Sequence, residues 1–249
     1  MNRFIRFGCI GLLSFSNQQL FANQSFASLD AGLARLSNLS SITIQNGSLS
    51  TNSMTNDTYL TKHDSQAMVG VTAGLMLPCQ SNWFSQYWIG LSFQHFAKQD
   101  IGDSVMQYSL SSSHRYRYHW YIQPNTLMVV NRLIMPLGNE TQAYAQFGIG
   151  VATIDVKGYH ENARENVTPR TTPAFADNQP INATYSASIG VQEPVQENLL
   201  VTVGYKYQYL GNLTSGLGAG EWSQTALRLK HVDAHMAIVG LTVFSSTMA

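Results

Sequence analysis

The chain has 249 residues, a formal net charge of zero at pH 7, 44% hydrophobic residues and only 11% charged residues. An ordinary soluble domain carries about 25% charged residues, so this chain lacks the charges that normally cover a water-facing surface. The sequence has no basic excess and no basic patch, which excludes nucleic acid as an expected partner.

Residues 1–22 have the layout of a secretory signal peptide. Two arginines precede the apolar run 7–15, which is too short to be a membrane-spanning helix. Both Ala22 and Ala27 offer the small residue that a cleavage site needs. We therefore predict a signal peptide over 1–22 and one mature domain over 23–249.

The mature domain keeps a single cysteine, Cys79, so no intramolecular disulfide can stabilise it. No run after the signal approaches the roughly 18 to 20 apolar residues of a membrane helix. An exported chain with few charges can still satisfy all its backbone groups in lipid by closing into a β-barrel.

Eight segments of the mature domain alternate between apolar and small or polar side chains with a period of two. This alternation is typical of a strand that lies between lipid and a barrel interior. In chain order the predicted strands are 25–36, 66–77, 85–97, one within 115–134, 143–153, 182–191, 199–209 and 227–244. The residues predicted to face lipid include Leu29, Leu33, Val69, Val71, Ile89, Leu91, Phe93, Phe147, Ile149, Tyr185, Ile189, Val203 and Tyr205.

Two of these strands are ambiguous. Pro124 interrupts the fourth strand and cannot donate to a ladder, so we expect a bulge or kink there, and the facing of Arg132 stays open. The strand at 227–244 is apolar on both faces near its end, so its register also stays open.

The connections between the predicted strands alternate strictly between short and long. Outer-membrane barrels place short turns in the periplasm and long loops outside, and a periplasmic N-terminus gives that arrangement here. The short connections are 77–84, 136–141 and 193–198, and the long ones are 37–65, 98–114, 158–180 and 211–226.

The polar face of the strands decides between a membrane barrel and a soluble one. It consists of Gly, Ser, Thr, Gln and Asn, and its cleanest strands carry almost no charge beyond Asp30 and Lys206. A water-exposed face would carry many Lys and Glu, whereas a narrow interior needs small neutral groups. We predict a closed antiparallel up-and-down transmembrane β-barrel of about eight strands. Its predicted interior network contains Asp30, Lys206, Gln94, Gln146 and Gln208.

The last strand ends in Val-Gly-Leu-Thr-Val-Phe at 239–244. With the signal, the alternation and the loop rhythm, this ending resembles the small outer-membrane barrels: the transmembrane domain of outer membrane protein A, outer membrane protein W and the opacity-type surface antigens. The resemblance implies a bacterial outer-membrane location, contact with lipid and lipopolysaccharide, insertion by the barrel assembly machinery and a monomeric state. One departure is the tail 245–249, because the family usually ends on its terminal aromatic residue.

Two enzyme classes share this fold, and each leaves a weak trace in the sequence. The lipid A deacylases carry a His-x-Ser dyad, which His63-Asp64-Ser65 matches without the rest of that motif. The lipid A palmitoyltransferases need a His and an Asp-Ser pair, for which Asp64-Ser65 or Asp103-Ser104 would have to serve. Polar loop residues are the simpler interpretation, and no catalytic set is predicted.

The pattern His231-x-Asp233-x-His235 places two imidazoles and a carboxylate on one strand face, but a metal would need further ligands. The aromatic runs 116–120 and 205–209 are explained more simply by the girdles at the membrane interfaces. We predict no metal, no cofactor and no enzymatic activity. The expected function is a surface anchor whose four loops meet an extracellular ligand. The alternatives are a narrow channel for small or apolar solutes and, third, a lipid A-modifying enzyme.

Overall fold

The structure of the protein is a computed structural model. It describes residues 24–39, 41–45, 56–62, 64–79, 83–138, 140–168, 175–218 and 225–245. The predicted signal peptide over 1–22, with the cleavage position after Ala22, lies outside the described residues, whereas Ala27 lies in the first strand. Among the residues described, no helix is long and apolar enough to cross a membrane.

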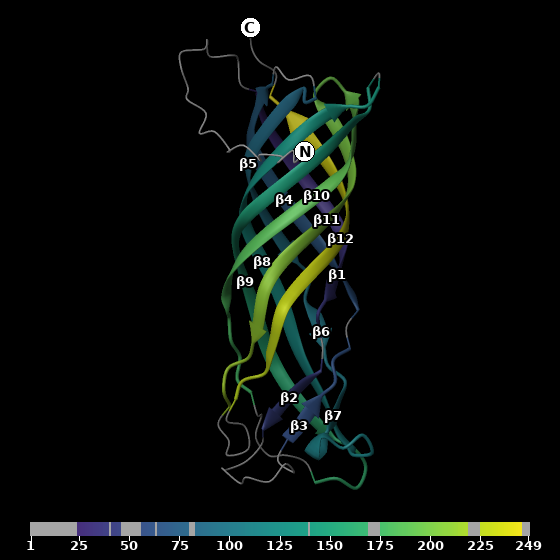
Figure 1. The fold of residues 1–249 in the computed structure, drawn as a ribbon, viewed down its shortest axis with the longest axis vertical. Coiled ribbons are helices and arrows are strands. Elements are labelled where there is room, and N and C mark those ends of the chain that lie inside the picture. The colour runs from purple at the N-terminus through teal and green to yellow at the C-terminus, as the bar shows by residue number, and fades with distance from the viewer. Residues whose placement is uncertain are drawn as a thin grey trace, which may run out of the picture.

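Eight long strands form a closed antiparallel barrel (Figure 1). Each strand pairs with its neighbour along the barrel, and the pairing of the first strand with the last closes the ring from Phe26–Phe244 to Ser37–Asp233. These strands are β1 (Gln24–Ser37), β4 (Ser65–Pro78), β5 (Gln86–Phe96), β8 (His114–Pro136), β9 (Gln142–Ala163), β10 (Ile181–Gln196), β11 (Leu199–Thr214) and β12 (Arg228–Phe244). The predicted fold and strand number are confirmed.

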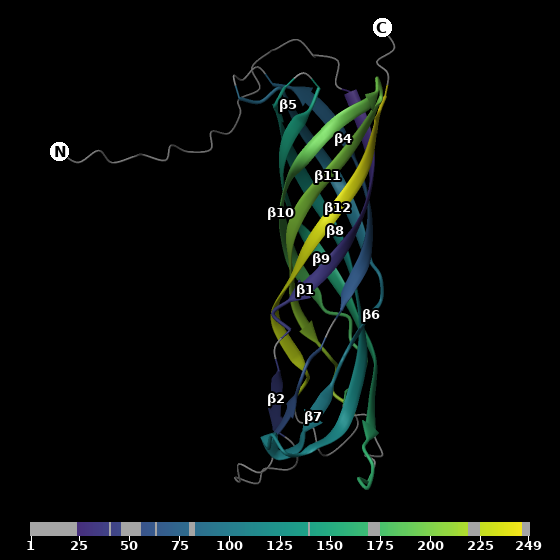
Figure 2. The same cartoon turned by 90° about the vertical axis from the view of Figure 1, so that its right-hand side faces the viewer.

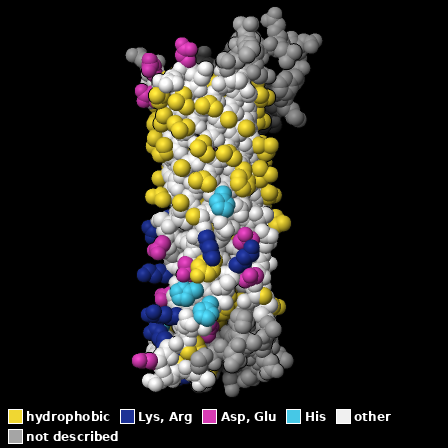
Figure 3. Space-filling model, turned by 180° about the vertical axis from the view of Figure 1, so that it is seen from behind, with side chains coloured by type: hydrophobic (Ala, Val, Ile, Leu, Met, Phe, Trp, Pro, Cys, Tyr) yellow, Lys and Arg dark blue, Asp and Glu magenta, His cyan; other side chains and the backbone are white. Residues whose placement is uncertain are grey.

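The side chains that were predicted to face lipid also point outward in the structure. The outward side chains of the barrel wall are apolar and strongly exposed, as Leu33 (64%), Ile149 (68%) and Ile189 (64%) illustrate. On the face shown in Figure 3 they form a band over one half of the barrel, and most of the charged side chains lie beyond that band, toward the other end. A band of this kind is the lipid-facing surface of a transmembrane barrel.

The long connections are not plain loops, which corrects the sequence-based expectation. Four short strands and one 3-10 turn lie at the barrel end that carries the long connections (Figure 2), and the short strands pair with one another and with β8. We call this the extracellular end and the opposite end the periplasmic end, after the orientation expected from the sequence. They are β2 (Ile42–Gln45), β3 (Asn56–Tyr59), β6 (Gln99–Ile101), β7 (Ser104–Met106) and the turn Gln107–Ser109. β9 and β11 also continue beyond their predicted ends at 153 and 209, to Ala163 and Thr214.

The barrel wall reverses its polarity along the strands. In β9 the outward residues Phe147, Ile149 and Val151 are apolar, whereas Asp155 and Lys157, farther along the strand, are outward and charged. The inward residues change in the opposite sense, from Gln146 and the following glycines to Ala152, Ile154 and Val156, which are buried. The reversal marks the height at which the exterior passes from lipid to water.

Pro124 lies where β8 changes partner on one edge. Toward β9 the ladder runs through Pro124 without a shift, and its irregularity lies at His119–Tyr121. Toward the other edge, pairing with β5 ends at Asn125 and pairing with β6 begins at Ile122. Proline is therefore tolerated because the ladder on that edge is interrupted at the same point. At Pro124 itself, the expected irregularity is present only on the edge toward β5 and β6. The side chain of Arg132, whose facing was left open, points inward.

The ladder between β10 and β11 ends at the pair Tyr185–Tyr209, although β10 extends from Ile181 and β11 continues to Thr214. Side chains bridge the gap there. Thr184 donates to the Tyr209 carbonyl, and Asn182 Nδ2 donates to the Asn212 carbonyl at 3.0 Å. Gly211 makes this possible, since its φ is +93° and any Cβ would lie 2.4 Å from the Asn182 side chain.

Candidate functional site

The interior at the periplasmic end contains a cluster of aromatic rings in tilted and T-shaped contact. Phe26 lies 4.8 Å from Trp88, and Trp88 lies 5.5 Å from Phe244, measured between ring centroids. The guanidinium of Arg132 lies 5.2 Å from the Trp88 ring and 4.6 Å from the Tyr144 ring. Both of those rings are buried, so they occupy the interior at this end of the barrel. Phe244 belongs to this cluster, so the last strand, whose register was left open, points its terminal aromatic side chain into the barrel.

The middle of the interior is a polar layer. Arg132 Nε donates to Gln146 Oε1 at 2.8 Å, and Gln208 Nε2 donates to Thr126 Oγ1 at 3.2 Å. Thr126 Oγ1 in turn lies 3.5 Å from Gln94 Oε1. Three of the residues named from the sequence, Gln94, Gln146 and Gln208, are therefore buried in this layer. Sequence reasoning missed Arg132, because Pro124 left the facing of its strand open.

Asp30 and Lys206 both face this polar layer, from β1 and β11 on either side of β12. Lys206 is 1% exposed and Asp30 is 9% exposed. The two groups interact electrostatically with each other and with Arg132, although no ion pair within 4.0 Å joins Asp30 to Lys206 in the described chain. Gly240 lies opposite Asp30, and a Cβ at that position would come within 2.3 Å of the Asp30 carboxylate.

The extracellular half of the interior is a large apolar core. Tyr59 contacts Tyr118 at 5.1 Å, and Phe175 contacts Tyr59 and Tyr159 at 5.9 and 5.0 Å, between ring centroids. Burial raises the pKa of Tyr118 to about 12, and burial likewise raises that of Tyr159. Tyr116, Tyr118 and Trp120 belong to this core. Their assignment to an interface girdle was wrong, because the polarity of β8 reverses before it reaches them.

The candidate enzyme residues are only partly brought together. His63 lies outside the described residues, and Ser65 begins β4. His114 Nδ1 lies 3.0 Å from Ser104 Oγ, a contact that the sequence did not predict. Ser104 is 4% exposed, and His114 begins the outer end of β8. The lipid-facing residue Leu127 is about 40 Å away along that strand at about 3.3 Å per residue.

A cluster of aromatic and imidazole rings covers the outer face of β10, β11 and β12. Its rings are in contact with one another: Tyr185 stacks on Tyr209 at 5.0 Å, Tyr207 contacts His235 at 5.5 Å, and Tyr209 contacts His231 at 6.2 Å, between ring centroids. Tyr205 also bonds to His235 Nδ1 through its hydroxyl. We call this surface the Tyr-His platform; it consists of Tyr185, Tyr205, Tyr207, Tyr209, His231 and His235.

Asp233 anchors the edge of the platform. Its Oδ1 accepts from the Tyr207 hydroxyl at 2.8 Å, and its Oδ2 accepts from Asn38 Nδ2 at 2.6 Å. His231 has a positive φ of 55°, at the irregular part of the β11–β12 ladder. The strand is therefore irregular at His231, and His231, Asp233 and His235 do not form the regular row of side chains that was expected from the sequence. No group of three metal-ligating side chains occurs in the part of the chain that the structure describes.

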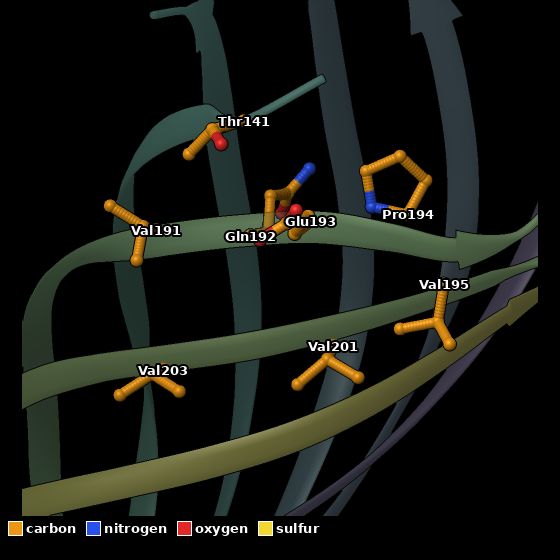
Figure 4. Close-up of a pocket in the computed structure, with 8 residues that line it drawn as sticks. All are labelled: Thr141, Val191, Gln192, Glu193, Pro194, Val195, Val201 and Val203. Carbon is orange, nitrogen blue, oxygen red and sulfur yellow. The ribbon is translucent and has the colours of Figure 1, made fainter.

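A shallow groove of about 470 Å³ lies on the barrel near its periplasmic end (Figure 4). It forms where the β10–β11 register shifts between Pro194 and Gln196. Its exposed valines include Val191, Val195 and Val203, which continue the apolar band. The groove therefore lies on the apolar exterior of the barrel wall.

The closed strand ring, the apolar exterior and the polar middle of the interior define a β-barrel protein of the bacterial outer membrane. The crystal structure of the outer membrane protein OprG from Pseudomonas aeruginosa is similar, with a TM-score of 0.50 and 12% identity over 90% of this chain and 97% of OprG.

Two further solved structures align with lower TM-scores. Neisserial surface protein A aligns with a TM-score of 0.44 and 13% identity, over 88% of this chain and 96% of its own. Ail, the attachment invasion locus protein of Yersinia pestis, aligns with a TM-score of 0.33 and 9% identity, over 89% and 99%. At such identities the likeness shows the fold alone. No protein-family profile and no curated protein sequence matches the chain.

Proposed function

We propose that the protein is a closed outer-membrane anchor whose folded outer half presents a surface for interaction outside the cell. The observation that supports this most directly is the interior, which is filled at both ends. The aromatic cluster around Trp88 closes the periplasmic end, and the apolar core around Tyr59, Tyr118 and Phe175 fills the extracellular end. Lipid and lipopolysaccharide surround the barrel, which the barrel assembly machinery inserts as a monomer.

The extracellular half is built as a surface rather than as a pore entrance. The short strands β2, β3, β6 and β7 continue the sheet beyond the membrane band and bury their apolar residues inward. Exposed charged residues such as Arg115, Arg117, Lys157 and Arg164 cover the outside of this part. A folded outer half of this kind holds contact residues in fixed positions, which favours specific recognition over simple steric protection.

Attachment of intact cells tests this proposal. Cells that produce the full chain should attach to a surface or to other cells more strongly than cells that produce a barrel with 38–64 and 99–113 replaced by short turns. A surface epitope tag should confirm equal display of both chains. Equal attachment at equal display would contradict the proposed role.

A narrow channel is the second candidate, and the polar layer around Arg132 and Lys206 is the observation that favours it. Conductance across a planar bilayer separates the two. The anchor should conduct at background level, and truncation of the plug by Trp88→Ala should raise conductance. Steady ion flow through the unaltered barrel would instead support the channel.

We further propose that the chain is not an enzyme. The Ser104–His114 contact lies in the extracellular half, far along β8 from the lipid-facing residues, so the acyl esters of lipid A lie out of its reach. Mass spectrometry of lipid A from producing and non-producing cells should give identical spectra. A gained or lost acyl chain would overturn this.

A further inference from the structure

We propose that the Tyr-His platform, together with Arg35, is a binding site for the phosphorylated sugar headgroup of an outer-leaflet glycolipid of the lipid A type. This goes beyond the anchor function, since it assigns a ligand to the barrel wall rather than to the outer half. The rings would stack against the sugar, and Arg35 with the imidazoles would hold a phosphate.

The first support is the one-sided distribution of the rings. An ordinary aromatic girdle runs around the whole barrel. Here six outward rings gather on three neighbouring strands, whereas β4 carries Ser65 opposite Arg35, and β9 carries Ile149 opposite Tyr185 and Val151 next in the outward row. On β5 the outward His95 has both ring nitrogens engaged, by Asn125 and Gln123. The platform is therefore a local surface and not a section of a ring.

The second support is the depth of the platform in the membrane. On β11 it follows directly on Val203, which is 52% exposed in the apolar band. On β12 His235 follows the apolar outward residues Val239 and Leu241 along the strand toward the outside. On β1 the outward row passes from Leu33 to Arg35. On β1, β11 and β12 the platform thus begins where the apolar rows end, which is the height of glycolipid headgroups. On β10 Tyr185 lies within the apolar row, which continues outward to Ile181.

The third support is the charge at the same place. Arg35 is paired with His235 across the β1–β12 ladder, and both side chains are exposed. Lys230 is exposed beside His231, farther out on the same strand. The carboxylate of Asp233 is already engaged by Tyr207 and Asn38. The groups left facing outward are therefore cationic or neutral donors, which suit a phosphate.

The orientation of the rings is fixed before any ligand arrives. The Tyr207 hydroxyl donates to Asp233, and the Tyr205 hydroxyl bonds to His235. Such preorganised aromatic surfaces lose little conformational entropy on binding, which is how flat rings recognise the faces of sugars with useful affinity.

The test uses the full mature chain in phosphatidylcholine nanodiscs that also contain bisphosphorylated lipid A, with bound lipid measured by native mass spectrometry. The double variant Arg35→Ala with His235→Ala should retain lipid A about tenfold less than the unaltered chain, as the loss of charge-assisted hydrogen bonds predicts. Tyr209→Phe keeps the ring and should bind normally, whereas Tyr209→Ala should bind several-fold less.

Two controls complete the experiment. His95→Ala removes an outward ring at a similar height on the opposite wall and should leave retention unchanged. Heat-modifiable mobility on gels shows that each variant is folded. Equal loss in His95→Ala, or equal retention of phosphatidylglycerol in place of lipid A, would overturn the site. A cross-linked dimer that Tyr209→Ala abolishes would likewise overturn it, because the platform would then be an interface between two copies.

Discussion

Arginine placed in the lipid band should destabilise the barrel by an amount that depends on depth. Ile149 is 68% exposed on the outer face of β9 and pairs with Val129 and Tyr185, so Ile149→Arg puts a cation among apolar neighbours. Charged residues near the bilayer midplane of a lipid-facing strand cost about 2–4 kcal/mol. This cost lowers the folding equilibrium constant by about 30- to 1000-fold, since about 1.4 kcal/mol is a factor of ten.

Thr153 provides the matched control on the same strand and the same face. It lies four residues nearer the extracellular side, about 13 Å along the strand at about 3.3 Å per residue, where the polarity of β9 reverses. Thr153→Arg should therefore cost only about 0–1 kcal/mol. Urea titration in lipid vesicles, followed by gel mobility of the folded form, measures both values. Equal costs for the two variants would refute the placement of the membrane boundary on this strand.

Three further predictions concern the interior. Asp30→Ala should destabilise the barrel more than the double change with Lys206→Ala, because the single variant leaves a buried cation without its partner; additive urea-refolding values would show that the two charges do not interact. Gly240→Ala should cost about 1–3 kcal/mol, since its Cβ would lie 2.3 Å from the Asp30 carboxylate, and an unchanged unfolding midpoint would contradict this packing. For Tyr118 the folded pKa of about 12 exceeds the ordinary value of 10.0, so its contribution to stability should be complete below pH 10 and lost as the pH rises toward 12; tyrosinate absorbance that follows an ordinary titration would argue against its burial.

The membrane-embedded part of the barrel could be predicted from the sequence because lipid imposes a rule on each residue separately. Leu33, Ile149 and Ile189 must be apolar wherever the chain is folded correctly, and their neighbours must be small or polar. A local pattern with period two is then sufficient to identify each strand and its outward face.

The outer half was not predicted because, in the same strands, its outward side chains are polar and its inward side chains are apolar. Beyond Thr153 the outward residues of β9 meet water, so Ile154 and Val156 turn the apolar row inward and the pattern loses its phase. The short strand β3 pairs with β7 from a different connection, and β2 joins the sheet through β3, so no local pattern encodes their place in the sheet.

Prediction of the candidate sites also required information on which distant segments lie side by side. Asp30 and Lys206 stood out as rare charges on a polar face, but Arg132 did not, since Pro124 obscured the phase of β8. The Tyr-His platform joins residues of three strands, and only the register between those strands brings Tyr185, Tyr209 and His231 together. The separate tyrosine and histidine motifs could be seen in the sequence, but their contact could not.

The reversal of polarity along the strands also fixes how the protein responds to bilayer thickness. A barrel with a uniformly apolar exterior can slide along its axis at little cost. Here an outward shift would expose Val151 to water, and an inward shift would carry Asp155 and Lys157 into hydrocarbon. In a thicker membrane the lipid must therefore adapt to the protein, by thinning locally around its rim, rather than the protein to the lipid.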